Sequence, residues 1–297
     1  MNAKPAIVPP AAIAVIGLGN MGVPMGACLV RAGYRVTGYD LSQTARQKFA
    51  DAGGTFATDG ADAVKSADVV ITLLPDGKAV QAALGSLQKS LKPGCVVIDM
   101  SSSEPLGTRA LAQSFIAAGF EFIDAPVSGG VKRAVDGTLA IMAGGDAATI
   151  DRVEPVLKAM GRSIFRTGLI GSGHAMKALN NYVSAAGLVA AVEATQIGEK
   201  FGLDPALMAD IFNASTGRNN TTEVKLKQFI ISKTFNAGFP MRLMAKDVRT
   251  ADALAHAIGV ATPLAALCAK LWGDASSTLG ESADHTEIGR YIERMTA

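Results

Sequence analysis

The chain has 297 residues, which is enough for one large domain or two ordinary ones. Hydrophobic residues make up 49% of it and charged residues 18%, so we expect a large buried core. The formal net charge of +2 is too small to indicate a nucleic-acid partner. The three cysteines and three histidines show neither disulfide nor metal-ligand spacing, which predicts a metal-free protein of the reducing cytoplasm.

The N-terminal segment has one lysine and three prolines within ten residues and lacks the regions of a signal peptide. We therefore expect a disordered lead-in over residues 1–11. No apolar run approaches the ~20 residues of a membrane-spanning helix, because glycine, proline or charge interrupts each one. No membrane partner is expected.

Up to about residue 172, short apolar runs alternate with amphipathic stretches such as Gln43–Ala52 and Pro105–Ala118. This alternation predicts an α/β fold with a doubly wound, mainly parallel sheet of the Rossmann type. The expected strands are Ile13–Gly17, Arg35–Tyr39, Val69–Leu74, Val96–Asp99, Phe120–Asp124, Leu139–Ala143 and Ser163–Thr167.

The second half has no strand pattern. His174–Gly202 is alanine-rich and free of proline, which predicts one helix of about eight turns. Beyond it we expect helices that stop at Gly202, Gly217, Gly238–Pro240, Gly259 and Gly273.

This change of pattern predicts two domains. The first is a dinucleotide-binding domain over 1–172, and the second is an all-helical C-terminal domain over 173–297 that begins with the long interdomain helix. Ligands of parallel sheets bind beyond the carboxyl ends of the strands. We therefore expect the functional site in the cleft between the domains.

The first expected strand leads directly into a glycine-rich turn, Gly17–Gly22, with the pattern G-x-G-x-x-G. In such a turn, the first glycine makes the tight bend, the second lets the backbone approach a pyrophosphate, and the third allows close packing of helix and strand. The start of the following helix then holds the anion. With a strand before it and a helix after it, this pattern predicts dinucleotide binding.

Asp40 ends the second expected strand, 18 residues beyond Gly22 and close to the usual spacing of ~20. Its carboxylate would accept hydrogen bonds from ribose hydroxyls and repel a 2′-phosphate, and no arginine follows until Arg46. The cofactor is therefore expected to be NAD, with NADP as the alternative. Asp40 also suits a helix N-cap.

Three further segments follow expected strands. Leu74 and Pro75 would pass the cofactor, and the hydroxyl of Ser102 could bind the nicotinamide, although Ser103 could equally cap a helix. Ser128, Gly129 and Gly130 present a hydroxyl and unobstructed N–H groups that suit a carboxylate. The same residues could form a plain turn.

The stretch Gly171–Asn181 places Lys177 and Asn181 four residues apart on the expected long helix, and such residues share a face. A lysine can exchange a proton with a substrate, and an asparagine can orient a substrate oxygen without titrating. The stretch would also fit a helix start with an exposed lysine.

Together, four motifs of the chain resemble those of a known enzyme family. Gly17–Gly22, Asp124–Gly130, Gly171–Asn181 and Lys246–Val248 occur in the order found in the β-hydroxyacid dehydrogenase family, which includes 3-hydroxyisobutyrate dehydrogenases and tartronate semialdehyde reductases. The chain resembles this family from about Ile13 to its end. The resemblance implies the two-domain architecture and a homodimer or homotetramer.

The resemblance also implies roles for individual residues. Lys177 is implied as the catalytic lysine, with Asn181 as its substrate-orienting partner. Lys246 is implied to lie near both nicotinamide and substrate, with Asp247 supporting it. The implied substrate-binding residues are Ser128, Gly129, Gly130 and Lys246, and the cofactor-binding residues are Gly17, Leu18, Gly19, Asn20, Met21, Gly22, Asp40, Leu74, Pro75, Ser102 and Lys246.

The expected activity is hydride transfer between NAD(P) and a small 3-hydroxy acid or the matching semialdehyde, with Lys177 as general acid and base. The alternatives are an imine reductase on the same fold and a non-catalytic dinucleotide-binding module, and the presence of Lys177 argues against both. The particular hydroxy acid and the direction of reaction are left open. Arg218 and Asn219 lie in a polar segment, where the arginine could bind a second substrate carboxylate.

Overall fold

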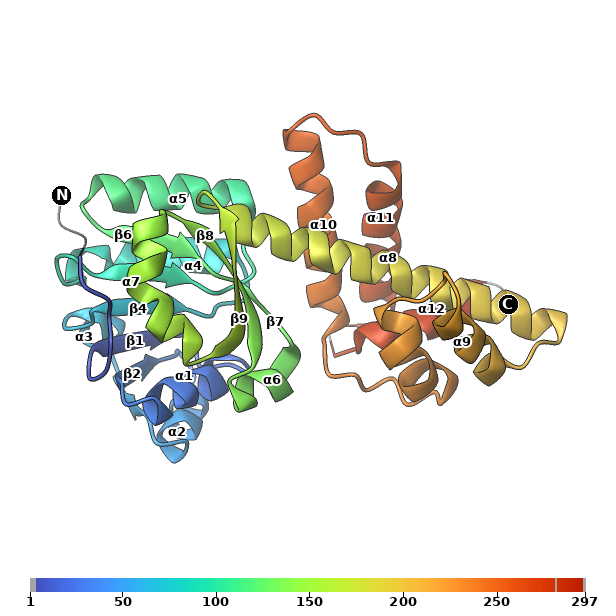
Figure 1. Cartoon of the computed structure of the whole chain (residues 1–297), viewed down its shortest axis with the longest axis horizontal. Coiled ribbons are helices and arrows are strands. Elements are labelled where there is room, and N and C mark those ends of the chain that lie inside the picture. The colour runs from blue at the N-terminus through green and yellow to red at the C-terminus, as the bar shows by residue number, and fades with distance from the viewer. Residues whose placement is uncertain (1–3, 281, 296–297) are drawn as a thin grey trace. The chain divides into compact units, whose positions relative to one another are not determined.

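The computed structural model describes residues 4–280 and 282–295. The chain divides into two compact units, 1–177 and 178–297, with the division inside helix α8 (Ser172–Phe201). Figure 1 shows the sheet-containing unit and the all-helical unit.

The first unit is built on one sheet, whose nine described strands lie in the order β3-β2-β1-β4-β5-β6-β8-β7, with β9 paired to β8. All pairings from β3 to β6 are parallel, and those of β8 with β6 and β7 are antiparallel. The strands are β1 (Ala12–Ile16), β2 (Arg35–Tyr39), β3 (Thr55–Phe56), β4 (Val69–Thr72), β5 (Val96–Asp99), β6 (Glu121–Asp124), β7 (Val127–Ser128), β8 (Leu139–Gly145) and β9 (Gly161–Gly168).

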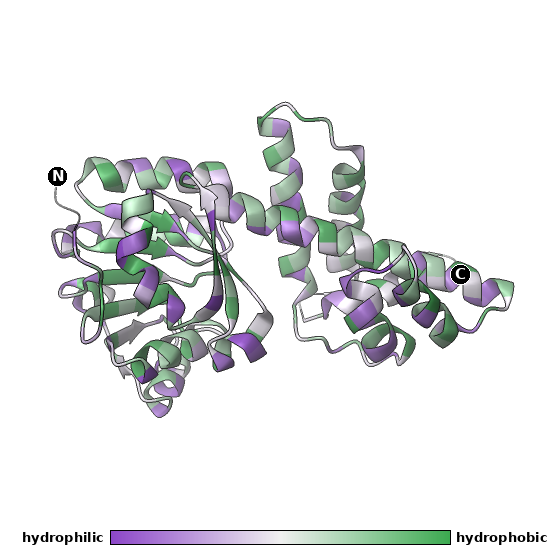
Figure 2. Cartoon of the chain, viewed as in Figure 1, coloured by the Kyte–Doolittle hydropathy of each residue, from purple (hydrophilic) through white to green (hydrophobic). Residues whose placement is uncertain are grey.

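Helices cover both faces of this sheet, so the central strands are apolar on both sides, as the green strands of Figure 2 show. Side chains from α1, α2, α6 and α7 pack on the face of Ile13 and Val15, and those from α3, α4 and α5 pack on the face of Ala14 and Ile16. The helices are α1 (Gly22–Arg31), α2 (Gln43–Asp51), α3 (Gly60–Val64), α4 (Gly77–Leu87), α5 (Pro105–Ala117), α6 (Gly130–Asp136) and α7 (Ala147–Lys158), with a short 3-10 turn, Gln88–Ser90.

The register of the parallel strands places their carboxyl ends at one edge. Ile16 lies opposite both Tyr39 and Thr72, Thr72 lies opposite Asp99, and Asp99 lies opposite Asp124. The chain order reverses direction at β1, where β2 lies on one side and β4 on the other. This is the topological switch point at which such sheets bind ligands.

The second unit packs around the fully buried Trp272, with apolar side chains from α8, α10 and α11. Its other elements are α9 (Pro205–Ala214), the π-helix η2 (Thr221–Ile231), α10 (Met241–Ala257), α11 (Pro263–Leu279), the 3-10 turn η3 (His285–Glu287) and α12 (Ile288–Met295). The helix stop expected at Gly273 is wrong, because this residue lies inside α11 in ordinary helical backbone.

The expected disordered lead-in is also wrong for residues 4–11, whereas residues 1–3 lie outside the described residues. Ile7 is buried in the sheet core, its N–H donates to the carbonyl of Arg152, and its carbonyl accepts from the hydroxyl of Tyr34. Lys4 forms an ion pair with Glu121. These long-range contacts outweigh the local preference of a proline-rich segment.

Candidate functional site

The glycine-rich turn connects β1 to α1 at the switch point of the sheet. Gly17 has a φ of +100°, and a Cβ atom there would lie 2.4 Å from the carbonyl oxygen of Leu73. A Cβ at Gly22 would lie 1.9 Å from the carbonyl oxygen of Gly17. Both glycines are therefore required by the fold itself.

Gly19 is different, because a Cβ atom there would meet nothing within 4 Å and its φ lies outside the left-handed region. The fold does not need a glycine at this position. A backbone left open beside the first turn of a helix fits a pyrophosphate, which needs close approach to N–H groups. The residues present therefore fit a dinucleotide.

The carboxylate of Asp40 supports this turn. Its Oδ2 accepts from the backbone N–H of Leu18 at 2.8 Å, and its Oδ1 accepts from the N–H of Ser42 at 2.8 Å. Each carboxylate oxygen can accept further hydrogen bonds, so the carboxylate can also bind ribose hydroxyls. The cap of α2 is Ser42 rather than Asp40.

Asp99, at the end of β5, holds together the segments that follow β4 and β5. It is buried and accepts hydrogen bonds from the hydroxyls of Thr72 and Ser103 and from the N–H of Ser101. The hydroxyl of Ser101 in turn accepts from the N–H of Leu74 at 2.9 Å. The Ser103 hydroxyl is therefore engaged by Asp99, and Glu104 occupies the N-cap position of α5.

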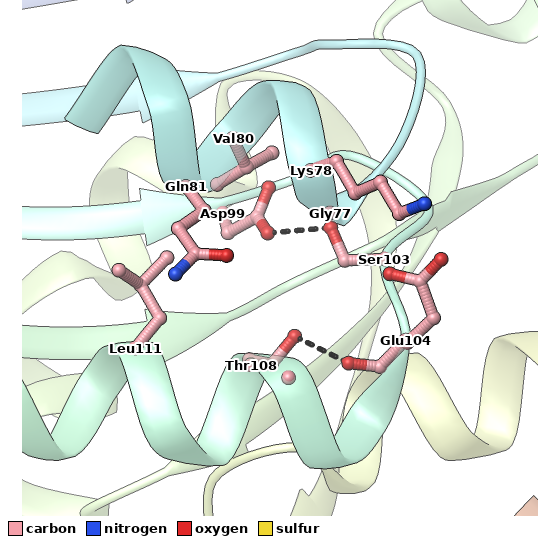
Figure 3. A pocket seen from close by; sticks show the side chains of 10 residues that line it. Gly77, Lys78, Val80, Gln81, Asp99, Ser103, Glu104, Thr108 and Leu111 are labelled. Atoms are coloured by element: carbon pink, nitrogen blue, oxygen red, sulfur yellow. Dashed lines mark hydrogen bonds between the residues drawn. The ribbon is translucent and has the colours of Figure 1, made fainter. Parts of the chain in front are cut away.

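Asp99 also lines a cavity of about 210 Å³ between α4 and α5, shown in Figure 3. The cavity is lined by polar groups of Lys78, Gln81, Glu104 and Thr108. It is smaller than the ~300–1,000 Å³ of ordinary ligand pockets, and the glycine-rich turn does not line it. The cavity is therefore separate from the glycine-rich turn.

The Ser128–Gly130 turn lies between β7 and α6. Gly129 and Gly130 have φ values of +135° and +68°, so their N–H groups adopt directions that other residues reach only with strain. Both glycines are exposed and Ser128 is partly exposed. Arg133 packs back against Gly129, where a Cβ atom would lie 2.6 Å from its Cδ atom.

A buried carboxylate fixes the start of α8. Asp124 accepts from the N–H groups of Gly171 and His174, both at 2.7 Å, and its burial raises the pKa of its carboxyl group. A Cβ atom at Gly173 would lie 2.2 Å from the carbonyl oxygen of Met142, so this glycine lets the helix start approach β8. Lys177 follows one turn later and is half-buried.

His174 is buried and belongs to the same cluster. Its Nδ1 atom lies 2.8 Å from the hydroxyl of Thr108, and its Nε2 atom lies 3.7 Å from Asp99. Among the described residues, no hydrogen-bond partner reaches Nε2. His174 therefore connects the start of α8 to α5 and to the carboxyl ends of β5 and β6.

In the second unit, Asp247 of α10 links two of the expected site residues. Its Oδ2 accepts from the Nδ2 of Asn181 at 2.5 Å, and its Oδ1 lies 3.3 Å from the Nζ of Lys246. Asn181 and Asp247 are both buried. Asp247 therefore fixes the Nδ2 side of the Asn181 amide and holds a cation beside it, while the Oδ1 of Asn181 accepts from the Nδ2 of Asn180 at 3.2 Å.

Arg218 and Asn219 are engaged by their own segment. Arg218 forms an ion pair with Glu223 at 2.5 Å and is largely exposed. The side-chain oxygen of Asn219 accepts from the N–H groups of Thr221 and Thr222 at the start of η2. In the parts of the chain that the structure covers, no metal-binding group of side chains occurs, and no helix has the length and apolarity to cross a membrane.

Comparisons with known proteins agree with this geometry. Residues 12–168 match the family described as the NAD binding domain of 6-phosphogluconate dehydrogenase, and residues 171–292 match the family described as NAD-binding of NADP-dependent 3-hydroxyisobutyrate dehydrogenase. The chain therefore belongs to the β-hydroxyacid dehydrogenase family and is an NAD(P)-dependent hydroxyacid dehydrogenase.

Individual relatives extend over nearly the whole chain. An NAD-dependent L-serine dehydrogenase of Pseudomonas aeruginosa is 36% identical over 88% of this chain and 90% of its own. A 2-(hydroxymethyl)glutarate dehydrogenase of Eubacterium barkeri is 33% identical over 96% and 95%. The solved structure of a Mycobacterium tuberculosis 3-hydroxyisobutyrate dehydrogenase with L-serine is 34% identical, with a TM-score of 0.89 over 95% of this chain and 99% of that one.

Proposed function

We propose that this protein oxidises the hydroxymethyl group of a small 3-hydroxy acid, or reduces the matching semialdehyde, with Lys177 as the general acid and base. The observation that carries the proposal is the placement of Lys177 on α8, one turn after its buried start and one turn before Asn181. Asn181 is in turn fixed by Asp247.

In oxidation, the bound nicotinamide cofactor supplies the hydride acceptor. The Nζ of Lys177 takes the proton that leaves the substrate hydroxyl, and it returns a proton in the reverse direction. General acid–base catalysis of this kind is typically worth ~10²–10⁴-fold in rate. The Asn181 carboxamide holds the hydroxyl in line, since Asp247 prevents it from rotating.

Other residues bind the two substrates. We assign the substrate carboxylate to Ser128, Gly129 and Gly130 together with the ammonium of Lys246. The pyrophosphate is assigned to the turn Gly17–Gly22 (with Leu18, Asn20 and Met21 between its glycines), and the adenosine ribose to Asp40. Leu74, Pro75, Ser102 and Lys246 are proposed to flank the nicotinamide half.

The substrates in the relatives' names share one chemical core. L-Serine, 3-hydroxyisobutyrate and 2-(hydroxymethyl)glutarate each carry a hydroxymethyl group on the carbon that bears the carboxylate, and they differ in the third substituent of that carbon. We therefore propose a substrate with this core. The preferred cofactor is proposed to be NAD, because the Asp40 carboxylate would repel a 2′-phosphate.

A substrate panel tests this function. Reduction of NAD⁺ and of NADP⁺ is followed by absorbance with 3-hydroxyisobutyrate, L-serine, 3-hydroxypropanoate and glycerate, and the reverse reaction with semialdehydes. We expect turnover of at least one 3-hydroxy acid, with NAD⁺ preferred. Binding of NADH without turnover of any acid or aldehyde would contradict the proposal and direct the search to imines.

A homodimer or homotetramer is proposed from the exposed side of α8. Val183, Ile197 and Phe201 are 68%, 71% and 84% exposed and lie on one side of the helix, away from Lys177 and Asn181. Leu207 and Ile211 of α9 add exposed apolar surface. We expect Phe201→Glu to lower the mass measured by light scattering, with Lys200→Glu as the control.

A location in the reducing cytoplasm is proposed, since Cys28, Cys95 and Cys268 are free.

A further inference from the structure

The π-helix η2 carries a half-buried lysine, Lys225, whose partner is a hydroxyl. The Nζ of Lys225 donates to the Oγ of Ser184 on α8 at 3.2 Å. Two neighbouring cations have carboxylate partners. Arg218, just before η2, pairs with Glu223, and Lys227 of η2 pairs with Asp210. Among the described residues, no carboxylate lies within ion-pair distance of Lys225.

Ser184 lies on the face of α8 that carries the proposed chemistry. Lys177, Asn181 and Ser184 follow the spacing i, i+4, i+7, which places them in one stripe along a helix. Ser184 is one turn beyond Asn181, about 4.5 Å further along the axis at 1.5 Å per residue. Lys225 therefore brings its ammonium to the end of the stripe remote from Lys177.

The segment that carries Lys225 runs along α8 at this point. A Cβ atom at Gly187, one turn beyond Ser184, would lie 3.7 Å from the side-chain amide of Asn219. The chain then enters η2, which keeps π-helical geometry for eleven residues. Such geometry is rare and is frequently found at functional sites, because it changes the direction of side chains relative to an α-helix.

Burial disfavours the charged form of this lysine. Removal from water lowers the pKa of Lys225, and the negative charge of Asp284 offsets part of this effect. A half-buried ammonium with no carboxylate at ion-pair distance is costly to the folded protein. A bound anion would restore its charge balance.

We infer that Lys225 and Ser184 form a second anion-binding subsite, which takes a carboxylate on the third substituent of the substrate carbon that bears the hydroxymethyl group. This inference rests on the proposed function, since the first carboxylate and the hydroxyl are held as assigned above. It makes the substrate a dicarboxylic 3-hydroxy acid. Lys225 then binds substrate without touching the reacting hydroxyl.

The test compares two compounds that differ only at the remote end. In 2-(hydroxymethyl)glutarate the side chain ends in a carboxylate, and in 2-(hydroxymethyl)pentanoate it ends in a methyl group. The measured quantity is the ratio of kcat/KM for the diacid to kcat/KM for the monoacid, with NAD⁺ and with NADP⁺. The variants are Lys225→Met, Lys225→Arg and the matched control Lys227→Met, which removes an exposed lysine of the same helix.

We expect the wild-type protein to prefer the diacid and Lys225→Met to lower the ratio by about 10- to 100-fold, the usual contribution of a charged hydrogen bond. Lys225→Arg should keep most of the preference, and Lys227→Met should leave the ratio unchanged. A wild-type preference for the monoacid, or an equal ratio in Lys225→Met and wild type, would overturn the inference while leaving the dehydrogenase function intact.

A binding measurement separates failure of the inference from failure of the proposed function. If neither compound is oxidised, calorimetric titration of both into the NADH-saturated protein decides. Tighter binding of the diacid that is lost in Lys225→Met would support the subsite and reject the reaction. Equal affinities for the diacid and the monoacid would reject the subsite as well.

Discussion

The three glycines of the cofactor turn predict different outcomes for the same substitution. In Gly19→Ala the added methyl group meets nothing within 4 Å, and the backbone conformation is one that alanine adopts without strain. We therefore expect the free energy of unfolding to be unchanged or raised by up to ~1 kcal/mol, because alanine restricts the unfolded chain.

Cofactor affinity should respond in the opposite way. The methyl group of Gly19→Ala would occupy space that a pyrophosphate needs to reach the backbone. Forcing an extra methyl group into a close contact typically costs about 1–3 kcal/mol. This corresponds to a loss of NADH affinity of about 5- to 150-fold.

Two matched variants separate the fold from the site. Gly22→Ala places its methyl group 1.9 Å from a backbone oxygen, so it should lose thermal stability together with NADH affinity. Gly85→Ala lies in α4 with nothing within 4 Å, and it should gain ~0.5–1 kcal/mol of stability and bind NADH as the wild type does.

The assay combines thermal unfolding without cofactor with NADH titration by fluorescence. The predicted signature of Gly19→Ala is an unchanged or higher Tm together with weaker NADH binding. NADH affinity equal to that of wild type in a folded Gly19→Ala protein would refute the assignment of the pyrophosphate to this turn.

Three further predictions follow from other parts of the chain. Asp40→Ser should raise the ratio of kcat/KM for NADP⁺ to that for NAD⁺ about tenfold, measured by initial rates, because a charge that repels the 2′-phosphate is lost; an unchanged ratio would contradict the role of Asp40. Lys225→Met should have a higher free energy of unfolding in urea than wild type at neutral pH, because the lowered pKa of the buried lysine makes its charged form costly in the folded protein. This difference should shrink as the pH rises toward 10.5, where the lysine loses its charge in both states. A difference that grows with pH would contradict this reasoning. Trp272→Ala should lose about 3–5 kcal/mol of unfolding free energy, since Trp272 is fully buried, and a loss below ~1 kcal/mol would show that α11 is not part of the core.

The sheet could be predicted from sequence because each long strand is a run of apolar residues between helical patterns. Val69–Thr72 and Val96–Asp99 are buried on both faces, so their pattern has no competing interpretation. The two-residue strands β3 and β7 could not be found in this way, since two residues show no periodicity. The π-helical geometry of η2 has no signal in the sequence either.

The glycine turn with Asp40 was expected from spacing, and it lies at the switch point of the sheet. The buried contacts behind the proposed catalytic residues could not be expected in the same way. Asp124 binds the N–H of His174 across 50 residues, and Asn181 binds Asp247 across 66. Such pairings depend on how the sheet and helices pack, and no local pattern reports them.

Lys225 was missed for a related reason. In the sequence, Arg218 is the more prominent candidate for a second substrate carboxylate, because it lies in a polar segment. The structure pairs Arg218 with Glu223, whereas Lys225 reaches Ser184 on α8. Only the packing of η2 against α8 distinguishes these two cations.

The central claim is that Lys177 transfers the substrate proton, and Lys177→Ala tests it most directly, with Lys200→Ala at the far end of α8 as the control. On the hydroxy acid identified by the panel, kcat should fall by at least ~10²-fold in Lys177→Ala, while NADH affinity stays within about twofold of wild type. Lys200→Ala should keep its turnover. Turnover in Lys177→Ala close to that of wild type would contradict the account.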